Sequence, residues 1–148
     1  MIRVQADPNN KKTFLKFETL SHDIFYEIEK AFWEIGKLVT SKLSNNILRT
    51  KKSGVMYKYK TRRLRASAAG EYPRNRSGFL RKSINFEVMS STRMEIGLSA
   101  PYAKYLQGDE DFAPKRLFPR KLLNEVIDDT DQEQRDILEK RMDAAVKR

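Results

Sequence analysis

The chain contains no cysteine and only one histidine, His22, among its 148 residues. Without cysteine there is no disulfide, no thiolate nucleophile and no cysteine-ligated zinc. A single histidine also excludes a metal site with two histidine ligands. Because a histidine beside acids such as Asp23 on a helix is usually part of a solvated charge pair, we expect no catalytic role for His22.

Long apolar runs and the common catalytic motifs are missing as well. No segment approaches the roughly 18–20 apolar residues that span a bilayer, and the N-terminus lacks an apolar signal core. The chain has no GxxxxGK[ST] or GxGxxG loop and no nucleophile elbow. The best metal-like cluster, Asp109-Glu110-Asp111, lacks the ligand spacing of an EF-hand. We therefore expect a soluble, non-enzymatic protein of cytosolic origin, without cofactor, metal or membrane partner.

The chain has an excess of positive charge, and this excess is concentrated in one segment. The sequence has 30 Lys and Arg against 20 Asp and Glu, a net charge of +10. Residues 49–82 hold twelve of these cations against one acid, Glu71, and carry +11, so the other 18 cations and 19 acids sum to −1. A basic segment on a near-neutral body is typical of contact with nucleic acid or with an acidic protein surface. The alternative is a solvated loop without a specific role.

Hydrophobic periodicity predicts a single α+β domain over residues 1–148. Apolar residues recur at steps of three and four over about 13–48, which predicts a long N-terminal helix. Strict alternation on both sides of a turn at 90–93 predicts an antiparallel hairpin over 84–99. The helix should pack on this small sheet. Because two strands alone are not stable, we expect a third strand from 55–65 or from near 116–118.

The remaining segments are assigned from turn residues and composition. Residues 1–12 form an N-terminal extension, 50–78 a basic mobile arm that includes a strand at 55–60, and 128–148 a C-terminal helix. Further short helices are expected at 79–84, after Pro101 and from about 121.

Several side chains receive specific interpretations. Trp33 is expected at the partly buried edge of the core, and Glu87 and Glu95 are expected to pair across the hairpin with Lys or Arg. Three residues of the helix after Pro101 are expected in the core: Tyr102, Tyr105 and Leu106. An acidic group belongs either to a helix N-terminal turn or to a contact with the basic arm of a neighbouring copy: Asp128, Asp129, Asp131, Glu133 and Asp136.

Five segments, in this order and spacing, carry a resemblance that covers about half of the chain. They are SGVMY (53–57), ASAAGEYP (66–73), SGFLRKSI (77–84), PYAKYLQG (101–108) and RLFP (116–119). Together they resemble the tail-completion or neck protein family of tailed bacteriophages, the group that includes minor tail protein Z of lambda-like phages. The chain departs from the family pattern at Ala69, Gln107 and Leu117.

The resemblance implies a structural virion protein at the head–tail junction, made in the host cytoplasm and without enzymatic activity. Copies would form a ring that joins the head connector or stopper to the tail terminator, and the basic arm would become ordered on assembly. It would also lie near DNA in the channel, where contact would be to phosphates and independent of sequence. The candidate assembly or DNA-channel residues are Lys51, Lys52, Lys58, Lys60, Arg62, Arg63, Arg65, Gly70, Glu71, Pro73, Arg74, Arg76, Gly78, Arg81 and Arg116.

Some roles stay open at this point. Arg116 either bridges subunits or caps the sheet, and Gly70, Pro73 and Gly78 are either bend points of the arm or ordinary loop residues. The rival function is a small basic nucleic-acid-binding module without catalytic activity. In that module three tyrosines interleaved among cations would stack on bases: Tyr57, Tyr59 and Tyr72.

Overall fold

The computed structural model describes residues 10–68, 70–103 and 122–147, with residues 10–20 and 122 described as backbone only. The described elements, in chain order, are α1 (Asn10–Arg49), β1 (Met56–Tyr59), β2 (Arg62–Arg65), α2 (Phe79–Lys82), β3 (Ile84–Ser90), β4 (Arg93–Leu98), α4 (Leu122–Asp129) and α5 (Asp131–Val146).

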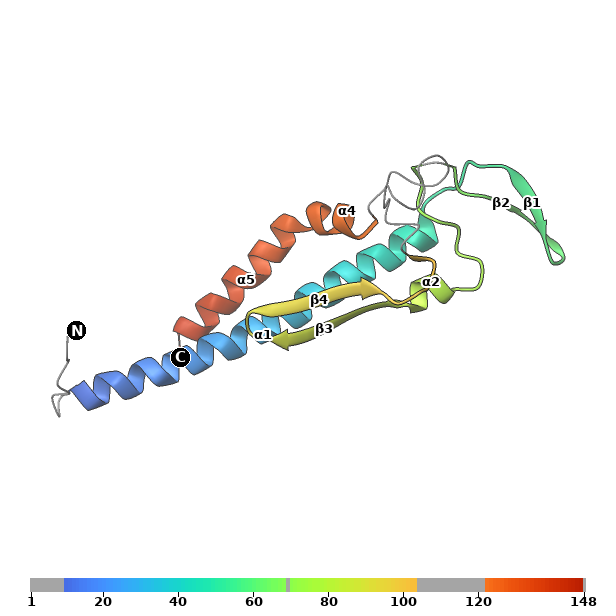
Figure 1. Ribbon diagram of the computed structural model, residues 1–148. Helices are drawn as coiled ribbons and strands as arrows, with labels where there is room; N and C mark the ends of the chain where they lie inside the picture. Colours follow the sequence, from blue (N-terminus) through green and yellow to red (C-terminus); the bar gives the residue numbers. More distant parts are fainter. Residues whose placement is uncertain (1–9, 69, 104–121, 148) are drawn as a thin grey trace, which may run out of the picture.

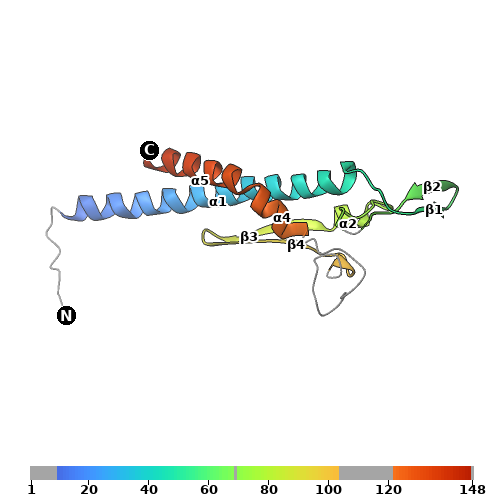
Figure 2. The ribbon, with the colours of Figure 1, turned by 90° about the horizontal axis from the view of Figure 1, so that it is seen from above.

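The expected α+β fold is confirmed, and α1 is the element around which it is arranged. The β3–β4 hairpin lies along one side of α1, and α4 and α5 lie along another (Figures 1 and 2). The β1–β2 hairpin extends beyond the C-terminal end of α1, away from the other elements (Figure 1). The fold therefore has a helix-based body with one projecting basic hairpin.

The buried strip of α1 repeats at every fourth residue. Its members are Glu27, Ala31, Ile35, Val39, Leu43 and Ile47. The core is completed by residues from the rest of the chain, among them Tyr72, Leu80 and Val126. Apolar character alone does not mark this strip, because the apolar Phe25 is half exposed and the acidic Glu27 is buried. In a helix of 3.6 residues per turn each step of four residues advances the strip by about 40°, so the strip winds gradually around α1.

A close approach between α1 and β3 depends on Gly36. A Cβ atom at this position would lie 2.3 Å from Cδ2 of the Phe86 ring. Trp33 packs edge-on against the same ring, with centroids 5.1 Å apart, and stays half exposed at the edge of the core, as expected. The bare helix surface at Gly36 thus lets the sheet reach α1.

The structure corrects several sequence-based expectations. Residues 55–65 do not supply the expected third strand of the β3–β4 sheet, because β1 and β2 pair only with each other. The alternative near 116–118 lies outside the described residues. Residues 10–12 belong to α1 rather than to an extension, and the C-terminal helix begins at Asp131, after α4. Tyr102 is 42% exposed and is not a core residue. Residues 1–9, Tyr105, Leu106 and the 109–111 acidic cluster lie outside the described residues.

The two glutamates of the β3–β4 hairpin also differ from expectation. Glu87 lies directly opposite Glu95, so neither has a cross-strand cation, and Arg93 pairs with Glu95 within β4. The acidic group near residue 130 is accounted for in part by the first turn of α5, which holds Asp131 and Glu133. There the carboxylates face the positive end of the helix dipole.

A charged network joins α5 to α1 at the buried Glu27. Arg141 Nη1 lies 3.2 Å from Glu27 Oε2, and Lys30 Nζ lies 3.1 Å from Glu27 Oε1. Arg141 also pairs with Glu34. Because Glu27 is only 1% exposed, its charge depends on these two cations for compensation.

Gly36→Ala should destabilise the protein despite the better helix propensity of alanine. The new methyl group meets the Phe86 ring, which Trp33 holds in place, and overpacking of this kind costs about 1–3 kcal/mol. Thermal or urea unfolding measures the loss. Gly97→Ala on β4 is the matched control, because the nearest atom to its Cβ is 3.8 Å away. Equal stability of the two variants would contradict the close contact.

Arg141→Leu should lower the free energy of unfolding by about 3 kcal/mol, because it leaves the buried Glu27 carboxylate with one cation fewer. Leucine and arginine have similar helix propensities, so the change reports on the loss of the Arg141 ion pairs with Glu27 and Glu34. Arg135→Leu breaks the exposed pair with Asp131 in the same helix. That control should cost less than about 1 kcal/mol in the same denaturation experiment. A similar small loss for both variants would show that Glu27 does not need Arg141.

Candidate assembly and nucleic-acid interface

The β1–β2 hairpin carries the densest part of the basic segment. The two strands are antiparallel, with Tyr59 opposite Arg62, so Lys60 and Thr61 form a two-residue turn. Lys60 has φ +54°, a left-handed conformation that glycine or asparagine adopts more easily. The tip of the hairpin therefore holds a charged side chain on a backbone that disfavours it.

Strand alternation sorts the hairpin residues onto two faces. Cross-strand partners share a face, so one face holds Tyr57, Tyr59, Arg62 and Leu64. The opposite face, here called the outer face, holds Met56, Lys58, Arg63 and Arg65. On the outer face Lys58 lies directly opposite Arg63, an unfavourable pairing of like charges.

Arg76 ties the first face to the following loop. Its Nε donates a hydrogen bond of 2.8 Å to Tyr57 Oη. Its guanidinium carbon lies 4.7 Å from the Tyr57 ring centroid and 5.6 Å from that of Tyr59. These cation–π contacts hold residues 74–76 against the hairpin.

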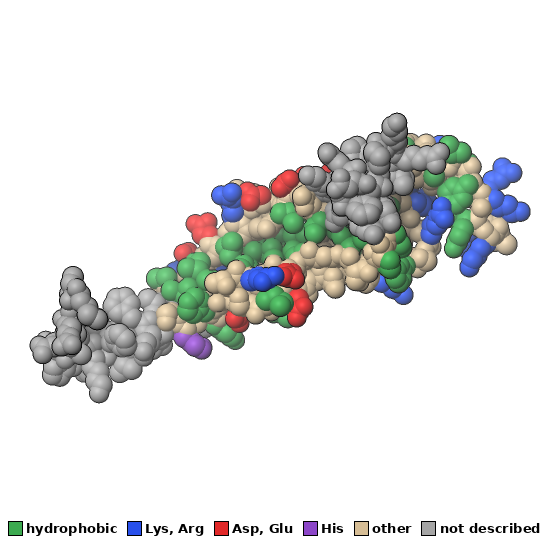
Figure 3. All heavy atoms as spheres, in the orientation of Figure 1, with side chains coloured by type: hydrophobic (Ala, Val, Ile, Leu, Met, Phe, Trp, Pro, Cys, Tyr) green, Lys and Arg blue, Asp and Glu red, His purple; other side chains and the backbone are tan. Residues whose placement is uncertain are grey.

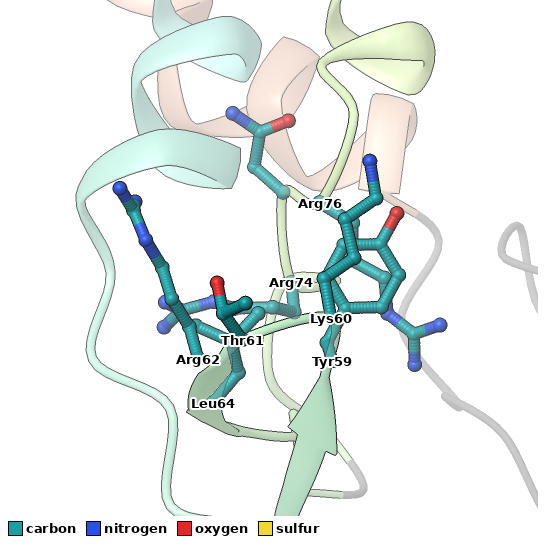
Figure 4. Close-up of a pocket in the computed structure, with 8 residues that line it drawn as sticks. Tyr59, Lys60, Thr61, Arg62, Leu64, Arg74 and Arg76 are labelled. Atoms are coloured by element: carbon teal, nitrogen blue, oxygen red, sulfur yellow. The ribbon is translucent and has the colours of Figure 1, made fainter.

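A pocket of about 430 Å³ lies between the hairpin and this loop (Figure 4). We call it the hairpin pocket, and its lining residues are Tyr59, Lys60, Thr61, Arg62, Leu64, Arg74, Asn75 and Arg76. The lining includes four cations and no carboxylate. None of these cations forms an ion pair within the part of the chain that the structure describes.

Glu71 closes the base of the arm. Its carboxylate accepts hydrogen bonds from the backbone N–H of Ser53, at 3.0 Å, and from that of Ala68, at 2.9 Å. The Ser53 hydroxyl also donates to it. The hydroxyl bond is the largest cause, with the two backbone bonds next, of a Glu71 pKa lowered to about 2. The one acid of the basic segment thus fastens the arm and does not neutralise the hairpin.

Tyr72 anchors the same loop in the core. The side chain is 4% exposed, and its hydroxyl accepts a 3.0 Å hydrogen bond from Asn46 Nδ2 on α1. Ser67 Oγ donates to the Tyr72 carbonyl at 2.9 Å. The expectation that Tyr72 stacks on bases is therefore wrong. Mobility of the arm stays a prediction, but its base is fastened at Glu71 and Tyr72.

The other sequence-selected residues divide by position. Gly70 and Gly78 have φ values of +78° and +76°, so both sit at left-handed positions that glycine suits. Lys51 and Lys52 lie near the base of the arm, where Lys52 donates to Thr50 Oγ1, and Arg81 belongs to α2. Pro73 is half-buried between Tyr72 and the pocket. Arg116 lies outside the described residues.

Charge is separated along the molecule. Lys and Arg side chains gather at the end formed by β1 and β2 (Figure 3). Residues 122–147, which form α4 and α5, hold eight acids and four cations and carry −4. Sequence reasoning found both groups. It missed the contact of Arg76 with Tyr57, because the two residues are 19 positions apart in the sequence.

Across residues 21–68, 70–103 and 123–147, no three acidic or histidine side chains group closely enough to hold a metal ion. Among the helices described, none combines the length and apolar character that crossing a membrane requires.

Comparison of the chain with protein-family models, with curated proteins and with solved structures found no match.

The Glu71 contacts predict a pH-dependent loop. Because the folded-state pKa of about 2 lies below the ordinary value of 4.5, these hydrogen bonds stabilise the folded loop above pH 4.5 and are lost as the pH falls through about 2. Hydrogen exchange at the Ser53 and Ala68 amides, referred to intrinsic rates, should show protection at pH 5 that disappears toward pH 2.

Glu71→Gln should remove most of this protection at every pH, because an amide is a weaker acceptor than a carboxylate. Glu87→Gln, on the exposed side of β3, should leave both amides unchanged. Full protection in the Glu71 variant would mean that the loop is closed by other contacts.

Proposed function

We propose that this protein is a structural virion component at the head–tail junction of a tailed bacteriophage. Copies assemble into a ring that joins the head connector or stopper to the tail terminator, and the protein catalyses no reaction. The order and spacing of the five segments between residues 53 and 119 are the basis of this proposal.

The projecting basic hairpin is the structural feature that most strongly supports this proposal. The β1–β2 hairpin projects from the body, and four of its cations, Lys58, Lys60, Arg62 and Arg63, form no ion pair with any carboxylate in the described ranges. This hairpin contributes little to the core, and its cations repel one another. Such an element is better suited to contact another molecule than to stabilise its own fold. This supports an assembly role for the arm.

The separation of charge supports association of copies with one another. A basic end and an acidic α4–α5 surface on one subunit are complementary, and complementary surfaces at different places give head-to-tail contacts. Such contacts close into a ring when the rotation between subunits allows it. The fastened base at Glu71 would give the hairpin a defined starting position for this contact.

The second candidate is a small basic nucleic-acid-binding module without catalytic activity. The hairpin pocket, with its four cations, favours it. The two candidates differ in the free subunit: the module binds DNA tightly as a monomer, whereas the neck protein binds weakly and without sequence preference until it assembles.

Particles made without this protein should accumulate as separate heads and tails, visible by negative-stain electron microscopy. Adding the purified chain to a mixture of the two should restore joined particles. A variant with Lys58, Arg63 and Arg65 changed to Gln should restore fewer of them, because it removes three cations from the outer face. Joined, infectious particles in the absence of the protein would contradict the proposed role.

A further inference from the structure

The hairpin pocket gathers positive charge that no carboxylate of the described residues neutralises. Lys60, Arg62, Arg74 and Arg76 line one volume of about 430 Å³. The lining side chains come from β1, from the turn, from β2 and from the loop (Figure 4). Cations held around one site raise the local potential and attract an anion.

The neutral side chains that line the pocket can also donate hydrogen bonds to an anion. Thr61 and Tyr59 contribute hydroxyl groups and Asn75 an amide, each of which can donate to an anionic oxygen. Leu64 is the one aliphatic lining residue. Small-molecule sites are mostly apolar, so this lining favours a charged, oxygen-rich group.

The aromatic rings point to phosphate rather than to a base. Arg76 lies over the rings of both Tyr57 and Tyr59, and Lys60 Nζ lies 5.9 Å from the Tyr59 centroid. A base that stacked there would compete with these cations. The arrangement leaves the guanidinium and ammonium groups, not the rings, as the contact surface.

The backbone at the rim gives an independent indication. Lys60 holds φ +54°, a left-handed conformation that is less favourable than the right-handed one for a residue with a Cβ atom. Glycine or asparagine would suit this turn better. Strain of this kind is concentrated at functional sites, and here it places an ammonium group at the pocket.

We propose that the hairpin pocket binds a phosphate group of a nucleic-acid backbone. The inference deepens the proposed neck function, and for the identity of the polymer it rests on the contact with channel DNA that the resemblance implies. Binding is independent of base sequence, because phosphates carry no sequence information.

Two double variants of the full chain test the pocket with equal loss of charge. Arg62→Gln with Arg74→Gln removes two pocket cations that make no hydrogen bond or ion pair in the described structure. Lys58→Gln with Arg63→Gln removes two cations from the outer face and relieves their repulsion. Arg76 is left in place because it holds Tyr57. Circular dichroism and thermal unfolding confirm that both variants fold.

Binding to a fluorescein-labelled 20-base-pair duplex is followed by anisotropy over a salt series. The pocket variant should bind about tenfold more weakly than the outer-face variant, and its slope of log K against log salt should be smaller by about 1–2. Equal losses in the two variants would overturn the pocket and leave only a diffuse basic surface. If the purified wild-type chain does not restore joined particles from separate heads and tails, the neck function is rejected, whatever the duplex experiment shows.

Competition with inorganic phosphate distinguishes a free phosphate from a phosphate of the polymer. Sodium chloride at the same ionic strength is the control. Displacement of the duplex from the wild-type chain, but not from the pocket variant, means that the pocket accepts a free phosphate. No displacement, with the pocket variant still impaired on the duplex, means that the phosphate must belong to the polymer. No salt-dependent binding of the duplex by the wild-type chain would overturn the proposal.

Lys60→Gly provides a second test that separates charge from folding. Glycine relieves the left-handed strain, so the variant should be at least as stable as the wild type, while its affinity for the duplex falls. Unchanged affinity for the duplex, together with unchanged or higher stability, would show that Lys60 does not take part in binding.

Discussion

Burial of one strip on α1 is the constraint on which the other elements depend. The strip includes Ile35, Val39 and Leu43 and runs along a 40-residue helix that cannot bury it alone. Isolated helices are marginal in water, and a two-stranded hairpin is no more stable. The β3–β4 hairpin, α4 and α5 each gain stability from covering α1, and α1 gains it from them.

The same constraint explains where the fold tolerates charge. Glu27 continues the four-residue repeat of the strip but carries a carboxylate, so it requires Arg141 from α5 and Lys30 from α1. This network ties the C-terminal helix to the N-terminal one more specifically than apolar contact does. Removing one partner of such a pair lowers the free energy of unfolding by more than the intact pair adds to it, because the remaining charge stays buried without compensation.

The β1–β2 hairpin is excluded from this core, and its chemistry follows from that exclusion. Contacts at its base and side fix its position, among them Glu71 on Ser53 and Ala68, Tyr72 in the core, and Arg76 on Tyr57. None of these neutralises the cations at the tip. An element fastened at its base and charged at its tip is suited to reach a partner that supplies the missing negative charge.

Local patterns in the sequence were enough for part of this structure. The period of 3.6 predicted α1, the alternation predicted β3 and β4, and the charge count located the basic arm, because each signal is contained within a short segment. Contacts between distant residues decided the rest: the separate pairing of β1 with β2, the burial of Glu27, the anchoring of Tyr72 and the clamp of Arg76 on Tyr57. No local pattern encodes a partner 19 or 114 residues away, so only the folded chain brings these groups together.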